Sequence, residues 1–100
     1  MSDQTGAFIH IAGIVQGVGF RPFVYGLATR IGLKGWVRNT SNGVEIRVDG
    51  YQSQLDRFIQ ELQQAAPPLS KIDSLTWEPR PPNGFQAFEI YRGKGGSLLR

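Results

Sequence analysis

An alternation of apolar and charged residues between Val44 and Asp49 is the clearest pattern in the chain. The apolar residues of this run would face the core, and Glu45, Arg47 and Asp49 would face water, which predicts a strand with one buried and one wet face. Other segments rich in β-branched and aromatic residues predict four further strands, at residues 8–14, 35–40, 72–78 and 85–91.

Apolar residues recur at helical spacing in two other segments. In residues 22–31, Pro22 suits the first helical position, and Gly32 can end the helix in a left-handed conformation. A second helix is expected from about residue 51 to residue 65, where the apolar residues form one stripe. The Pro67-Pro68 pair that follows would stop it.

These elements follow one another in the order β-α-β-β-α-β, with a fifth strand added. Two helices must then cover the apolar face of one antiparallel sheet, so the predicted fold class is α+β, the ferredoxin-like split βαβ sandwich. In that arrangement we expect strand 35–40 to lie beside strand 8–14. Residues 8–91 would form one domain, with a disordered N-terminus over 1–7 and a tail or linker to downstream domains over 92–100.

The composition excludes several classes of function. The 100 residues contain no Cys and a single His, which excludes a thiolate nucleophile, a Cys-ligated metal site and a multi-histidine centre, so we expect no metal and no cofactor. The net charge of +3 is spread along the chain without a basic cluster, and no segment reaches the roughly 20 apolar residues of a membrane span. We therefore expect a cytoplasmic protein with a small anionic substrate and no nucleic-acid or membrane partner.

The most informative segment is Gly13 to Arg21, with the sequence G-I-V-Q-G-V-G-F-R. It joins the first strand to the first helix, so its backbone N–H groups lie at a helix N-terminus, where they have no intrahelical partner and the helix dipole is positive. Gly17 and Gly19 allow the loop to curl around an anion, and Arg21 adds a planar set of donors that match phosphate oxygens. The alternative is that the glycines serve packing and that Arg21 forms a surface ion pair.

Asn39 stands in a second informative segment, Gly35 to Gly43, with the sequence G-W-V-R-N-T-S-N-G. If the sheet brings Asn39 near the glycine loop, its carboxamide can hold and aim a water molecule, because it has both a donor and an acceptor. The alternative is an Asn that initiates the turn before Gly43.

Together the two segments resemble the two signature motifs of the acylphosphatase family, and the resemblance extends over about Phe8 to Tyr91 in the same element order. It implies that Arg21 is the phosphate-binding arginine and that Asn39 is the catalytic asparagine that orients the attacking water. The backbone of the loop would complete the phosphate site, through Gln16, Gly17, Val18, Gly19 and Phe20. Hydrolysis of an acyl phosphate expels a carboxylate, whose conjugate acid has a pKa of about 4, so no protein acid is needed.

Two segments, one at the end of the first motif and one after the second predicted helix, resemble one branch of this family more than the other. Arg21 to Val24 and Ala66 to Asp73 are similar to the N-terminal acylphosphatase-like domain of the carbamoyltransferases of nickel–iron hydrogenase maturation. That resemblance implies hydrolysis of carbamoyl phosphate to carbamate and phosphate, downstream domains in the same chain and a hydrogenase-maturation partner protein.

This interpretation has three alternatives: two use the same motifs and one is a different class of function. A free-standing acylphosphatase and a catalytically silent phosphate-binding module both stay open, because the same motifs would serve either. RNA binding through the open face of the sheet is disfavoured, because the strand at 44–49 carries no outward aromatic residue on which a base could stack.

Overall fold

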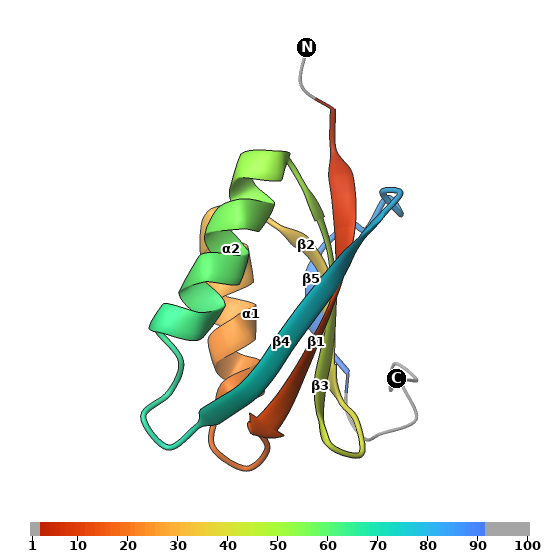
Figure 1. The fold of residues 1–100 in the computed structure, drawn as a ribbon. Helices are drawn as coiled ribbons and strands as arrows, with labels where there is room; N and C mark the ends of the chain where they lie inside the picture. Colours follow the sequence, from red (N-terminus) through yellow and green to blue (C-terminus); the bar gives the residue numbers. More distant parts are fainter. Residues whose placement is uncertain (1–2, 92–100) are drawn as a thin grey trace.

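The structure, a computed structural model, describes residues 3–91. These residues form five strands and two helices, in the order β1 (Thr5–Ile14), α1 (Phe20–Ile31), β2 (Lys34–Asn39), β3 (Gly43–Gly50), α2 (Gln52–Gln64), β4 (Lys71–Arg80) and β5 (Phe88–Ile90). The strands make one sheet, and both helices lie on the same face of it (Figure 1). The predicted α+β fold, with two helices over one face of a single sheet, is confirmed. Neither of the two helices in the described part is long and apolar enough to cross a membrane.

The sheet is mixed, whereas we predicted a wholly antiparallel one. Its strand order is β4-β1-β3-β2-β5, and each neighbouring pair is antiparallel except β2 and β5, which are parallel. The reason lies in where β4 ends: its last residue, Arg80, pairs with Gly6 near the start of β1. The chain therefore enters β5 from the end of the sheet at which β1 and β2 also begin, after residues 81–87 have crossed to the far edge.

The prediction that strand 35–40 lies beside strand 8–14 is wrong, because β3 lies between them. β3 pairs with β1 on one side and with β2 on the other, antiparallel in both cases. β1 and β2 consequently run in the same direction, and their carboxyl ends lie at the same end of the sheet. Asn39 still comes level with the end of β1, since Val44 pairs with both Ile11 and Asn39.

The first strand begins earlier than predicted. We expected residues 1–7 to be disordered, but β1 starts at Thr5, which pairs with Gly50 of β3. Ala7 is fully buried, so the domain uses this residue of the segment in its core. The predicted tail, residues 92–100, lies outside the described residues.

Two other boundaries differ, and one is confirmed. α1 begins at Phe20, so Pro22 is its third residue rather than its first; its missing N–H still costs no intrahelical hydrogen bond there. β5 is shorter than the predicted segment 85–91, because only Phe88–Ile90 lies in the strand. Gly32 ends α1 in the left-handed conformation, as predicted, with φ of 100°.

The core lies between the helices and the sheet. The predicted inner face of β3, Val44, Ile46 and Val48, is fully buried. Facing the sheet are the buried side chains of the helices, Phe20, Val24, Leu27 and Ala28 from α1 and Leu55, Phe58 and Leu62 from α2. The opposite face of the sheet is partly exposed, and it carries His10.

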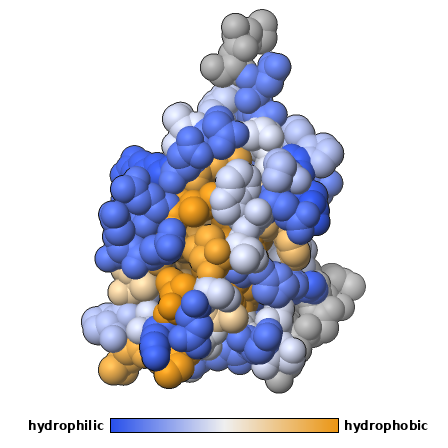
Figure 2. All heavy atoms as spheres, viewed as in Figure 1, coloured by the Kyte–Doolittle hydropathy of each residue, from blue (hydrophilic) through white to orange (hydrophobic). Residues whose placement is uncertain are grey.

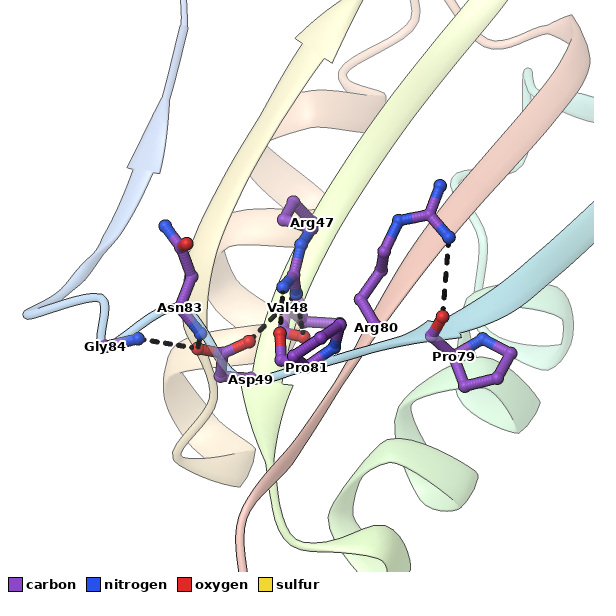
Figure 3. Close-up of polar contacts among 8 residues, drawn as sticks. All are labelled: Arg47, Val48, Asp49, Pro79, Arg80, Pro81, Asn83 and Gly84. Carbon is purple, nitrogen blue, oxygen red and sulfur yellow. Dashed lines mark hydrogen bonds and ion pairs between the residues drawn. The ribbon is translucent and has the colours of Figure 1, made fainter.

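Asp49 is an exception on the outer face of β3. We expected it to face water, but it is only 3% exposed. Residues 81–84, on their way from β4 to β5, cover it and donate hydrogen bonds to its carboxylate (Figure 3). The alternation could not reveal this, because it specifies which face a side chain takes and not what covers that face.

The helix layer covers the β4 side of the sheet incompletely. A band of apolar surface is visible between α2 and β4 (Figure 2). Trp77 of β4 pairs with Ile9 and so faces the helices, yet it is 44% exposed. The centre of the sheet, rather than its β4 edge, therefore contributes most of the buried contact with the helices.

Replacing Phe58 with Ala should lower the free energy of unfolding by about 3–5 kcal/mol, because its side chain is fully buried between α2 and the sheet. Urea unfolding followed by circular dichroism measures this quantity. Gln60→Ala, on the exposed side of the same helix, is the matched control and should change it by less than about 0.5 kcal/mol. A loss below about 1 kcal/mol for Phe58→Ala would contradict the described packing of α2.

Candidate functional site

Three strands end at the end of the sheet where the predicted site residues lie. β1, β2 and β5 run in the same direction, so their carboxyl ends lie together, at the lower end of the sheet in Figure 1. The loop from β1 to α1, the turn from β2 to β3 and Tyr91 after β5 all begin there. Segments far apart in the sequence are thereby gathered at one place.

The loop between β1 and α1 is shaped by two glycines. Gly17 has φ of 75° and Gly19 has φ of 81°, both in the left-handed region that strains any residue with a side chain. A Cβ at either position would meet no other part of the described chain within 4 Å. Backbone conformation rather than crowding therefore requires glycine here, and the space over the loop is open.

The first turn of α1 has no side-chain cap. Gly19 occupies the N-cap position and has no side-chain acceptor, and the first turn contains no acidic residue. Within the described residues, the backbone N–H groups of residues 16–19 donate to no backbone carbonyl. These donors and the positive end of the helix dipole make this position suited to an anion.

The side chain of Gln16 ties the loop to the turn that follows β2. Its Nε2 donates to the carbonyl of Thr40 at 2.6 Å and to the carbonyl of Gly43 at 2.8 Å. The N–H of Thr40 also donates to the Gly43 carbonyl, at 2.9 Å. Sequence reasoning assigned only the backbone of Gln16 to the site and missed this contact, because nothing in the motif spacing marks a partner 24 residues away.

Arg21 lies half-buried in the first turn of α1, and Tyr91 holds its guanidinium. Nη1 of Arg21 donates to the Tyr91 carbonyl at 3.0 Å. The ring of Tyr91 stacks on Trp36, with the ring centroids 5.3 Å apart. Arg21 forms no ion pair with any residue of the range 3–91, so the structure gives no support to a surface ion pair there. Sequence reasoning missed Tyr91, because only the parallel placement of β5 brings it to Arg21.

Asn39 is the last residue of β2 and takes the same face of the strand as the buried Val37, which is the face that the helices cover. Its Oδ1 is buried and has no hydrogen-bond partner among the described residues, and the same is true of Thr40 Oγ1. Buried polar atoms are nearly always satisfied in proteins, so an orphaned carboxamide oxygen indicates an acceptor for a bound molecule. An Asn that only initiated a turn would instead bond to the turn backbone.

The predicted site residues are thus brought to one end of the sheet through two separate links. Gln16 joins the glycine loop to the segment of Asn39, and Tyr91 joins Arg21 to β5; no hydrogen bond connects Arg21 to Asn39 within residues 3–91. His10 lies on the outer face of the sheet with Nε2 3.5 Å from Glu45 Oε2, away from this site. No group of three or more His, Cys, Asp or Glu side chains that could hold a metal ion occurs in that same range. The arrangement offers N–H donors and a guanidinium for a tetrahedral anion, and a carboxamide acceptor for water.

Comparisons with known proteins identify both free-standing and multidomain relatives. A family model described as Acylphosphatase matches residues 7–90. An acylphosphatase of Bacillus pumilus is 43% identical over 86 residues, which cover 85% of this chain and 92% of that protein. The carbamoyltransferase HypF of Rhizobium leguminosarum is 42% identical over 88 residues, which cover 88% of this chain and 11% of that protein. The chain therefore spans only about a tenth of the length of such carbamoyltransferase relatives.

Solved structures agree with these relatives. The crystal structure of full-length HypF in the phosphate- and nucleotide-bound form matches with a TM-score of 0.90 and 37% identity, covering 99% of this chain and 13% of that one. The acylphosphatase from Bacillus subtilis matches with a TM-score of 0.81 and 34% identity, covering 90% of this chain and 100% of that one. The chain belongs to the acylphosphatase family, as its two motifs predicted, and it is similar both to free-standing acylphosphatases and to the acylphosphatase-like domain of HypF carbamoyltransferases.

Proposed function

We propose that the site hydrolyses an acyl phosphate, that its substrate is carbamoyl phosphate, and that it works as one domain of a carbamoyltransferase in nickel–iron hydrogenase maturation. Membership of the acylphosphatase family supports the class of reaction. Similarity to HypF carbamoyltransferases, which are much longer than this chain, supports the larger context. The products would be carbamate and inorganic phosphate.

The main support for catalysis, as opposed to binding alone, is the buried and unpartnered Oδ1 of Asn39. A loop of N–H donors would bind phosphate and do no more. Asn39 directly precedes the turn that Gln16 ties to this loop, so an acceptor for water stands next to the anion site. We infer that Asn39 orients the attacking water, and that Arg21 and the backbone of residues 16–20 hold the phosphoryl group.

The proposed reaction depends on positioning and charge stabilisation rather than on an acid or a base. The water oxygen forms a bond to phosphorus while the bond between phosphorus and the acyl oxygen breaks, and the acyl oxygen leaves with the electron pair as a carboxylate. The conjugate acid of such a carboxylate has a pKa of about 4, so the leaving group needs no proton. The proton lost by the water passes to the phosphate product or to solvent. Arg21 and the loop N–H groups stabilise the charge on the phosphoryl oxygens in the transition state.

The assignment of carbamoyl phosphate rests on where the polar groups of the site are directed. All the donors assigned above serve the phosphoryl group, which leaves the acyl group without a strong polar contact. A small acyl group such as carbamoyl needs none, and the named function of the HypF relatives favours it over larger groups. A free-standing acylphosphatase and a silent phosphate-binding module are the alternatives that the following experiments separate.

The purified chain should release inorganic phosphate from carbamoyl phosphate and from benzoyl phosphate in a buffer that contains EDTA, because the proposed steps use only Arg21, Asn39 and backbone groups. A colorimetric phosphate assay, corrected for spontaneous hydrolysis, measures the rates. Phosphate binding without turnover of either compound would favour the silent module. Turnover of benzoyl phosphate alone would favour an acylphosphatase with a different acyl preference.

Arg21→Ala should weaken the binding of inorganic phosphate at least about 100-fold, because two charge-assisted hydrogen bonds of about 1.5–3 kcal/mol each are lost. Isothermal titration with phosphate measures the Kd. The matched control is Arg30→Ala, in the last turn of the same helix, where the side chain is exposed and its ion pair with Glu61 is long at 3.9 Å. Arg30→Ala should leave the Kd within about 2-fold of wild type, and an equal loss in both variants would contradict a specific role for Arg21.

Asn39→Ala should reduce kcat for acyl phosphates about 100-fold, because the attacking water is no longer held in line, and should leave the Kd for phosphate within about 3-fold of wild type. Steady-state kinetics and phosphate titration measure the two quantities separately. Asn42→Ala, at an exposed position of the adjoining turn, is the control and should retain wild-type kcat. Normal turnover by Asn39→Ala would refute the proposed role of its carboxamide.

A further inference from the structure

The connection from β4 to β5, residues 81–87, crosses the end of the sheet opposite the proposed site, and we call it the strap. β4 and β5 are the two edge strands, so the strap passes the starts of β1 and β2 and the end of β3. It contains no helix or strand, and Pro81 and Pro82 have no N–H group to donate. Its placement therefore depends on a small number of side-chain contacts.

Asp49 and Arg47 of β3 supply those contacts (Figure 3). Oδ2 of Asp49 accepts hydrogen bonds from the N–H groups of Asn83 at 2.6 Å and Gly84 at 3.1 Å. Oδ1 of Asp49 accepts one from Nη1 of Arg47 at 2.8 Å, and Nη2 of Arg47 donates to the Pro81 carbonyl at 2.6 Å. The Asp49 carboxylate is buried, so these charge-assisted bonds are little weakened by competing water.

The strap leads directly into β5, and β5 leads to Arg21. The carbonyl of Ala87 accepts a hydrogen bond from Gly35 at 3.0 Å, and the N–H of Tyr91 donates to the Val37 carbonyl at 2.9 Å. Between them, β5 is a three-residue edge strand that pairs with β2 alone. Phe88 of this strand is buried and Ile90 packs against the core, so these contacts and the strap together set the position of β5. The Tyr91 carbonyl at its end is the partner of Arg21 Nη1.

We propose that Asp49 is a positioning residue for Arg21, acting through the strap and β5; this inference rests on the proposed phosphate-binding role of Arg21. Asp49 pairs with Lys34 at the start of β2. Lys34 lies five residues before Asn39, so Asp49 is about 17 Å along the sheet from the end that carries the proposed site. By holding the strap it fixes the start of β5, and thereby the Tyr91 carbonyl that orients the guanidinium. An oriented guanidinium binds phosphate with less loss of side-chain freedom.

The first test measures the link from Asp49 to β5 without reference to catalysis. Asp49→Ala leaves two strap N–H groups without an acceptor and removes the carboxylate partner of Arg47, which keeps the Val48 and Pro81 carbonyls, so the strap should loosen. Hydrogen exchange followed by NMR should show the Tyr91 amide exchanging at least about 10-fold faster, relative to the Ile46 amide in the central strand β3, which reports global unfolding. Asp49→Asn keeps one acceptor oxygen for the strap and should recover much of the protection.

The second test measures the link to the phosphate site. Asp49→Ala should raise the Kd for inorganic phosphate about 5-fold at a temperature where the protein is folded, and Asp49→Asn should raise it less than about 2-fold. The control is Asp73→Ala, the same change of side chain and charge at an exposed position of β4, which should alter neither measurement. If Asp49→Ala does not fold, Asn83→Pro removes one strap donor while leaving the Asp49–Arg47 pair intact. It should also raise both the relative exchange rate of the Tyr91 amide and the Kd for inorganic phosphate.

Unchanged exchange of the Tyr91 amide relative to Ile46 would overturn the proposal, because the strap would then not place β5. Faster exchange with an unchanged Kd would also overturn it, because Arg21 would then be independent of Tyr91. A wild-type chain that binds no phosphate would defeat the proposed function instead, and the exchange experiment would still report whether Asp49 holds β5.

Discussion

The N–H groups at the start of α1 are the constraint around which the rest of the site is arranged. A helix usually begins at a residue whose side chain accepts a hydrogen bond from its first turn, but α1 begins after Gly19, which has no side-chain acceptor. The preceding glycine turns the loop so that further N–H groups of residues 16–19 donate to no backbone carbonyl of the described chain. Donors left in this state favour an acceptor from outside the protein, and a phosphoryl group carries several. The remaining site residues can be understood by how they are held relative to this loop.

The topology of the sheet positions the other site residues relative to this loop. Because β1, β2 and β5 run in the same direction, the loop, Asn39 and Tyr91 lie at one end of the sheet although they are distant in sequence. The side chain of Gln16 connects the loop to the turn after Asn39 by hydrogen bonds, and the Tyr91 carbonyl accepts a hydrogen bond from Arg21. This arrangement has a structural cost, since β5 can take its direction only if the chain crosses the whole sheet after β4. The buried Asp49, which has no other evident use, lies where that crossing must be held.

The residues assigned to the reaction lie within the segment that the acylphosphatase family model matches, residues 7–90. The family includes proteins of about this length and domains of proteins about eight times longer. The proposed site of backbone groups, one guanidinium and one carboxamide would suit both settings, because the proposed chemistry needs only a held charge and an oriented water. The difference between the two settings would then lie in what happens to the product rather than in the hydrolytic step.

Local sequence patterns determined most of the elements of this protein and marked its candidate site residues. Alternation in 44–49 specified the buried face of β3, apolar periodicity specified both helices, and Gly17, Gly19, Arg21 and Asn39 were marked by residue type and spacing. These features depend on neighbours within a few residues, which is why the sequence alone reveals them. The tertiary structure alone decided that β3 separates β1 from β2, that β5 is parallel to β2, that Asp49 is buried and that Gln16 and Tyr91 hold the site. Each of these depends on which strands become neighbours, and a pattern with a period of two or 3.6 residues contains no information about partners dozens of residues away.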